Sequence, residues 1–166
     1  MAPPPGPPTI TLPRLPRLHR AIQGAMGWTN SHLHQFAIDG ARYAEPDGFM
    51  DRIINHKNIK LAGVLGDQIR ELMYEYDFGD GWSHRVVVEQ MREGHPAWSG
   101  SLCTAGERAC PPEDVGGPWG YVEFLSAMAD PAHEGHLDVL TWIGGVFDPE
   151  GFDINAANDR IRRLKG

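Results

Sequence analysis

The chain has 166 residues, 41% of them hydrophobic, which is the length of one ordinary domain with a core of its own. Its 22 acidic residues outnumber 15 basic ones, so the formal net charge is -7 at pH 7. Because nucleic-acid binding requires lysine and arginine to offset phosphate charge, tight binding of duplex DNA is not expected. No apolar run approaches the roughly 20 residues of a transmembrane helix, which argues against a membrane protein.

Residues 1–13 form a proline-rich tail, and residues 14–166 are predicted to form a single domain. Proline has no N–H for a hydrogen-bonded ladder, so we expect the tail to be disordered or polyproline-like, with at most a short strand over residues 9–12. The first residues lack the basic and apolar regions of a secretory signal. We therefore expect a cytoplasmic protein in which both cysteines are thiols.

The first regular elements are a helix and a strand. Apolar residues at helical spacing predict a helix from Leu15 to about Met26, ended by a glycine. The alternation of residues 32–39 predicts a strand that breaks at Gly40. Residues 44–58 are mostly polar, and we expect either a loop or a short helical segment there.

A hairpin over residues 70–89 is the clearest structural signal of the chain. Apolar and polar residues alternate over 72–78, and residues 82–88 are rich in β-branched side chains. Asp80-Gly81 is a strong turn dipeptide, because glycine adopts positive φ without a Cβ clash and aspartate accepts hydrogen bonds from nearby N–H groups. The turn therefore gathers ionisable and aromatic side chains.

Three helices are expected after a long irregular connection over residues 92–117. The first begins near Pro118, and the third closes the chain. The second begins at Asp130-Pro131 and is predicted to bury Leu137 and Leu140. Because strands come first and helices later, we predict an α+β fold, an antiparallel sheet with a central hairpin, packed against an N-terminal helix and about three C-terminal helices.

The residues that flank the hairpin turn are the first candidates for chemistry. Asp77, Asp80 and His84 could form an acid/base or metal-binding group, because carboxylates and imidazole bind divalent metals. The alternative is that Asp80 builds the turn and that Asp77 accepts hydrogen bonds from backbone groups beside it.

The cysteines and the remaining histidines offer weaker metal candidates. Cys103 and Cys110 could hold a tetrahedral zinc completed by His84 and His95, although two reduced thiols are favoured because the spacing is unusual for zinc. Two histidine pairs, each on one face of a predicted element, could also chelate a metal, and the alternative is that they are hydrogen-bonded packing residues. These pairs are His32 with His34, and His133 with His136.

Several segments resemble the plasmid pRiA4b ORF-3-like family, in its order, from about Leu15 to the C-terminus. The resemblance implies an α+β domain and an association with mobile elements. Members usually begin with a strand, for which this chain has only Met1 to Pro13, and many carry a cysteine at the position of Val115. The matching segments are LHRAIQ (18–23), MGWTNSHLHQF (26–36), YDFGDGWSH (76–84) with VVVE (86–89), Cys103, CPPED (110–114), GGPWGY (116–121), and Asp130-Pro131 with His133 and His136.

We favour a non-enzymatic binding or adaptor module that holds a protein or small-molecule ligand on the loop face around the 77–84 turn and the 103–120 loop. The alternative is a metal-assisted hydrolase or nuclease that uses zinc or another divalent metal. A resolvase-like DNA-processing protein is less favoured, because few arginines accompany the loop serines. The candidate binding surface consists of Asp77, Asp80, Trp82, His84, Glu113, Asp114 and Trp119.

The short N-terminal segment also bears on assembly. If the family's first strand is missing, one edge of the sheet presents unpaired N–H and C=O groups, which native proteins normally cover. We expect either that residues 9–12 supply a short substitute strand or that the edge pairs with a second copy to give a homodimer.

Overall fold

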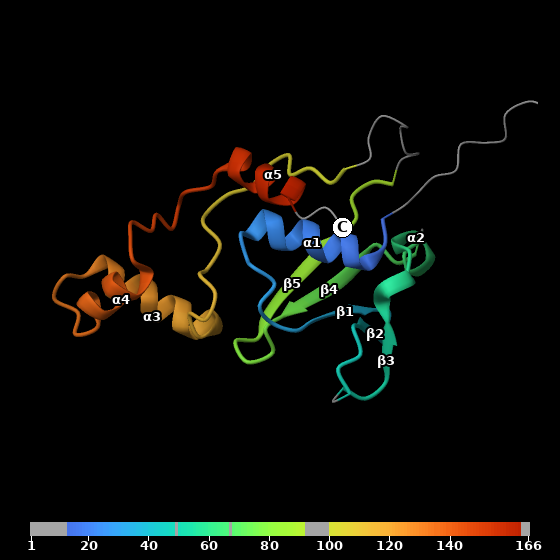
Figure 1. Ribbon diagram of the computed structural model, residues 1–166, viewed down its shortest axis with the longest axis horizontal. Helices are drawn as coiled ribbons and strands as arrows, with labels where there is room; N and C mark the ends of the chain where they lie inside the picture. The colour runs from blue at the N-terminus through green and yellow to red at the C-terminus, as the bar shows by residue number, and fades with distance from the viewer. Residues whose placement is uncertain (1–12, 49, 67, 92–99, 164–166) are drawn as a thin grey trace, which may run out of the picture.

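A five-stranded sheet with a helix across one face forms the body of the protein in the computed structural model, which describes residues 13–48, 50–66, 68–91 and 100–163 (Figure 1). The chain is therefore α+β, as predicted. The elements in chain order are α1 (Leu15–Met26), β1 (His34–Ile38), β2 (Ala41–Ala44), β3 (Ile53–Asn55), the 3-10 helix η1 (His56–Asn58), α2 (Leu61–Val64), β4 (Glu71–Tyr76), β5 (Trp82–Val87), α3 (Gly117–Ala129), α4 (His136–Ile143) and α5 (Ile154–Arg163).

The strands lie in the order β3-β2-β1-β4-β5, which makes β1 the central strand. All neighbouring strands are antiparallel except β2 and β3, which are parallel. The hairpin predicted over residues 70–89 is confirmed, with Tyr76 opposite Trp82 beside the turn. It lies at one edge of the sheet rather than in the centre, because β1 pairs with both β2 and β4.

One face of the sheet packs under α1 and carries the core. Phe36, Tyr74 and Tyr76 are buried on this face, and Leu15 of α1 is buried in the same cluster. Full burial of a large apolar side chain contributes roughly 1.5–3 kcal/mol, so these few residues dominate the stability of the sheet–helix contact. Residues that alternate with them, such as the exposed Glu71, point to the opposite face.

The predicted first helix is confirmed, and α5 packs across it (Figure 1). α1 ends at Gly27, whose φ of 88° is a left-handed conformation that glycine adopts without strain. The two helices cross at Gly24, where a Cβ atom would lie only 2.8 Å from Cγ1 of Ile161. The absence of a side chain at Gly24 therefore sets the close approach of α1 and α5.

The predicted burial of α4 is wrong. Three C-terminal helices are present as expected, but α4 begins at His136 rather than at Asp130-Pro131. Leu137 is 74% exposed and Leu140 is 38% exposed. The reason is that α3 and α4 pack mainly against each other, beside the end of the sheet (Figure 1), so each helix has one face without cover in the described part of the chain.

The structure describes one of the two regions whose secondary structure the sequence left open. Residues 44–58 contain the expected short helical segment, η1, together with the unexpected strand β3. The strand considered for residues 9–12 lies outside the described residues. At the start of the described chain, Leu61 N donates to Pro13 O at 2.9 Å and Leu15 N donates to Ile59 O at 2.9 Å. The beginning of α1 is therefore hydrogen-bonded to the segment that begins α2. No helix in the described ranges is long and apolar enough to cross a membrane.

Candidate metal centre

Three loops meet at the end of the sheet where the β4–β5 hairpin turns. They are residues 28–32, which connect α1 to β1, residues 77–81, which form the turn, and residues 111–117, which lead into α3. Because β1 and β4 are antiparallel, the segment before β1 and the segment after β4 come to the same end of the sheet. The candidate site lies among these loops.

Direct contacts join the 111–117 segment to the other two loops. Trp28 Nε1 donates to Pro111 O at 3.1 Å, and Gly116 N donates to Asp80 Oδ2 at 3.1 Å. At Gly117 a Cβ atom would lie 2.0 Å from Asp80 O, so only glycine permits this approach of the two backbones. The sequence Gly116-Gly117 thus fixes the segment against the turn.

Glu113 connects the same loops and places the next residue, Asp114. Its carboxylate accepts hydrogen bonds from Thr29 N at 3.2 Å, from Thr29 Oγ1, and from Tyr76 OH at 2.5 Å. Burial acts to raise the pKa of Glu113, but the hydrogen bonds from Thr29 and Tyr76 outweigh it, and the net pKa is lowered. Burial, and then the hydrogen bond to Glu113, raise the pKa of Tyr76, which keeps its hydroxyl protonated as the donor.

Asp77 is a buried carboxylate with one oxygen used by the turn and one turned towards His32. It is 8% exposed and adopts a left-handed φ of 54°. Asp77 Oδ1 accepts hydrogen bonds from Gly79 N at 3.1 Å and Asp80 N at 3.3 Å, as the turn interpretation predicted. Oδ2 lies 3.6 Å from His32 Nε2.

His32, Asp77 and Asp114 converge on one point. Each offers one ligand atom, and the three atoms lie within 4.8 Å of one another. His32 Nε2 lies 3.0 Å from Asp114 Oδ1, yet this nitrogen is buried and makes no hydrogen bond within the described ranges. The nitrogen of His32 is thus close to both carboxylates without a hydrogen bond to either. This is the arrangement expected of side chains that bind one metal ion between them.

The spacing and the donor set fit a divalent ion. Ligands ~2.1 Å from a metal are ~3.0 Å apart at octahedral angles and ~3.4 Å apart at tetrahedral angles. The separations from His32 Nε2, 3.0 Å and 3.6 Å, lie close to these values. One imidazole nitrogen with two carboxylate oxygens suits manganese, iron or zinc, whereas calcium prefers six to eight oxygen ligands.

A polar cavity of about 440 Å³ adjoins this cluster and shares His32 with it. The rings of His19 and His34 stack at 3.5 Å, and His34 Nε2 lies 2.9 Å from His56 Nε2. Burial lowers the pKa of His34 to about 3 and that of His19 to about 4. Burial also lowers the pKa of His56. The imidazoles of this histidine cluster (His19, His34 and His56) are therefore neutral at pH 7.

The structure divides the predicted binding surface. Asp77 and Asp114 join the cluster, whereas Trp82 and His84 point into the core beside Trp28, whose ring centroid is 5.3 Å from that of His84. Burial lowers the pKa of His84. Trp119, by contrast, is 87% exposed on α3. Of the predicted group Asp77, Asp80 and His84, only Asp77 belongs to the metal-ligand cluster.

The two cysteines are not brought together with His84 as ligands in the described part of the chain. Both are free, and the Cys103 backbone is bound to α5 through Asn158, whose side chain accepts from Cys103 N at 2.8 Å and donates to Cys103 O at 2.9 Å. Burial raises the pKa of the Cys110 thiol to about 12, so a thiolate there is disfavoured. His95, the other predicted completing ligand, lies outside the described residues.

The histidine pairs take separate roles. His133 Nε2 lies 3.1 Å from Glu123 Oε1, and His136 Nδ1 lies 2.7 Å from Ala127 O, so both connect the α4 region to α3. His34 lies in β1 and its Nε2 faces His56, whereas His32 lies in the bend before the strand and its Nε2 faces Asp77 and Asp114.

Sequence reasoning missed that His32 combines with Asp77 and Asp114. One signal pointed to it, since His34 pairs with Tyr76 in the antiparallel β1–β4 register, which brings the residues before His34 beside those after Tyr76. Reading that register requires knowing that the two strands are neighbours, and they are separated by β2 and β3 in the chain.

These features define an α+β protein with a histidine and two aspartates gathered at the loop end of its sheet. The chain belongs to the plasmid pRiA4b ORF-3-like protein family, whose model matches residues 10–156. It is 43% identical over 149 residues to uncharacterized protein y4hQ of Sinorhizobium fredii (strain NBRC 101917 / NGR234), covering 87% of this chain and 73% of that protein. The crystal structure of MM3350, a protein of unknown function from Methanosarcina mazei Go1, is similar with a TM-score of 0.79 and 36% identity, covering 87% of this chain and 83% of that chain.

Proposed function

We propose that this protein is a metal-binding module, in which His32, Asp77 and Asp114 hold a divalent transition-metal ion and leave the remaining coordination positions to a ligand. The observation that carries the proposal is the convergence of one buried nitrogen and two carboxylates from three different loops. Three protein ligands are typical of metal centres that keep a position open for water or another molecule. The two aspartates would balance the charge of the ion.

The surroundings favour a small molecule as the ligand on the ion. The cavity that shares His32 provides an adjoining polar space, and Asp114 is 70% exposed at the surface. Duplex DNA is not the expected partner, because a net charge of -7 opposes binding to phosphate. A protein partner on the loop face is the second choice, supported by the exposed Trp119.

Calorimetric titration of chelator-treated protein with Mn²⁺ and Zn²⁺ tests the proposal, together with elemental analysis of freshly purified protein. We expect one strong site in the wild type and a loss of affinity of at least tenfold in Asp77→Asn. Asparagine tolerates the left-handed conformation and can still accept the turn's hydrogen bonds, so this variant removes charge but keeps the turn.

Asp39→Asn is the matched control. Asp39 has a left-handed φ of 48° in the β1–β2 turn, at the opposite end of β1 from the cluster. It should bind the ion as the wild type does. Equal affinity in wild type and Asp77→Asn, or no binding of either ion by the wild type, would contradict the proposal.

Metal-assisted hydrolysis is a second candidate function, favoured by the cavity that adjoins the cluster through His32 and could hold a substrate. A metal ion held by His32, Asp77 and Asp114 would supply an activated water, whereas His34, whose pKa burial lowers to about 3, is too weak a base to take the proton of that water at pH 7. The test is hydrolysis of a p-nitrophenyl phosphodiester by the Mn²⁺- or Zn²⁺-loaded protein. Turnover that is lost in Asp77→Asn supports an enzyme, and metal binding without turnover leaves the binding module.

A further inference from the structure

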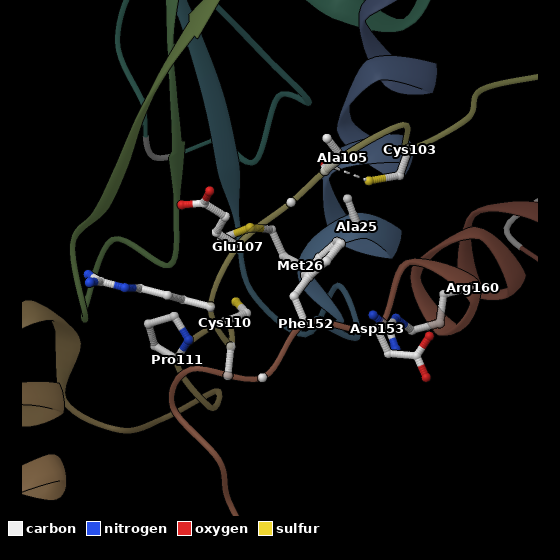
Figure 2. A pocket seen from close by; sticks show the side chains of 14 residues that line it. Ala25, Met26, Cys103, Ala105, Glu107, Cys110, Pro111, Phe152, Asp153 and Arg160 are labelled. Atoms are coloured by element: carbon white, nitrogen blue, oxygen red, sulfur yellow. Dashed lines mark hydrogen bonds between the residues drawn. The ribbon is translucent and has the colours of Figure 1, made fainter.

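A second cavity, of about 470 Å³, lies at the C-terminal end of α1, between α1 and α5 (Figure 2). Ala25 and Met26 of α1 line it, together with Phe152 and Pro111 from two loops, and these side chains give it apolar walls. It shares no lining residue with the metal cluster or the histidine cluster. Cavities of 300–1,000 Å³ with apolar walls and a few polar groups are typical small-molecule sites.

The walls of this cavity are held in place by specific contacts. Asn158 of α5 binds both backbone groups of Cys103, and Ala109 N donates to Pro149 O at 3.0 Å. At Gly106 a Cβ atom would lie 2.4 Å from the Phe152 ring, so the 103–111 segment lies directly on that ring. A ligand would therefore enter a cavity whose shape already exists.

Arg160 is the half-buried cation of the cavity, and its orientation is fixed. Its Nε donates to Gly24 O at 2.9 Å, while its two terminal nitrogens have no ion-pair or hydrogen-bond partner within the described ranges. The guanidinium is planar and pre-organised to bind a carboxylate with two parallel hydrogen bonds. The carbonyl at the C-terminal end of α1 compensates the charge only in part, so the two terminal nitrogens remain available for a further acceptor.

The other charged groups around the cavity are already engaged or exposed. Arg108 Nε lies 3.3 Å from Glu150 Oε2, and Asp153 Oδ1 accepts hydrogen bonds from the first backbone N–H groups of α5. Glu107 is exposed to solvent. The neighbouring Cys110 thiol is neutral at pH 7 because burial raises its pKa to about 12. None of these groups neutralises Arg160 at short range.

We propose that this cavity binds a small monocarboxylic acid with an aromatic or branched apolar body, whose carboxylate pairs with Arg160 and whose body packs against Met26 and Phe152. The apolar walls would supply affinity through burial, and the guanidinium would select the acid over its uncharged amide.

Phenylacetate and its uncharged analogue phenylacetamide are suitable probes, and NMR titration of protein labelled at the methionine methyl groups follows both. We expect the Met26 methyl signal to shift with either probe, and phenylacetate to bind at least tenfold more tightly. Arg160→Gln should abolish that preference. Arg162→Gln removes an exposed arginine of the same helix, paired with Asp159 at 2.6 Å, and should keep it.

An Ala25→Phe variant provides an independent test if Arg160→Gln fails to fold. It fills the apolar end of the cavity and leaves Arg160 unchanged, so it should bind neither probe. Equal affinity for the acid and the amide in the wild type, no shift of the Met26 signal, or unchanged binding in Ala25→Phe would overturn the proposal. Any of these results leaves the metal centre unaffected, since the two sites share no residue.

Discussion

The histidine cluster makes the stability of the fold depend on pH in a way that can be measured. In the native protein, burial lowers the pKa of His34 to about 3 and that of His19 to about 4, from ordinary values near 6.5. The unfolded chain therefore binds more protons than the native state once the pH falls below 6.5. Protonation of these two histidines therefore leaves the free energy of unfolding unchanged above that pH. It lowers the free energy of unfolding as the pH falls towards the native pKa values.

The magnitude follows from these values. Between pH 7 and pH 4.5 the unfolded state gains a proton on each imidazole, while the native state gains much less because both native pKa values lie below 4.5. Since one pKa unit corresponds to 1.36 kcal/mol, each of the two histidines should cost about 2 to 3 kcal/mol over this range. That is a large part of the roughly 5–15 kcal/mol that stabilises a typical domain.

His34→Gln isolates one of these contributions, because glutamine does not titrate. Urea unfolding of wild type and variant in the same buffers cancels the protonation of carboxylates. We expect the variant to be less stable at pH 7, and its deficit relative to wild type to shrink by about 2 to 3 kcal/mol at pH 4.5. Phe36→Leu destabilises the same strand without removing a titrating group, so its deficit should stay constant. Parallel pH curves for wild type and His34→Gln would refute the reasoning.

Three further predictions concern the backbone and the surface. Gly24→Ala should lower the free energy of unfolding by about 1–3 kcal/mol, because the new Cβ would lie 2.8 Å from Cγ1 of Ile161, whereas Gly63→Ala meets no atom within 4 Å and should cost less in the same urea experiment. Gly81→Val should cost on the order of 1 kcal/mol or more, since its φ of 71° disfavours a β-branched residue; an unchanged urea midpoint would contradict this. Fluorescence anisotropy at physiological salt should detect no submicromolar binding to duplex DNA, and a salt-sensitive affinity in that range would show that a local basic patch outweighs the net charge of -7.

Elements encoded by short-range patterns could be predicted from the sequence. The β4–β5 hairpin followed from alternation and the Asp80-Gly81 turn, and α1 followed from apolar spacing ended by Gly27. One of the two interpretations of Asp77, that it accepts hydrogen bonds from backbone N–H groups of its own turn, is confirmed. In each case the groups that determine the geometry lie within a few residues of one another, so the signal is local.

The tertiary structure decided which distant groups meet. The exposure of Leu137 could not be predicted, because the spacing of apolar residues on α4 does not tell whether another element covers them. His32 joins Asp77 and Asp114 only because β1 lies beside β4 and Gly117 lets the 111–117 segment approach the turn.

The charge state of buried groups was decided in the same way. By itself, the sequence determined the fold class, the hairpin with its turn and the inventory of ionisable side chains. Packing alone decided that His19, His34 and His56 are held neutral and that Arg160 lies at an apolar cavity with no ion-pair partner among the described residues. The physical reason is that pKa values and ion pairing depend on burial and on neighbours distant in the chain, and three-dimensional folding creates both.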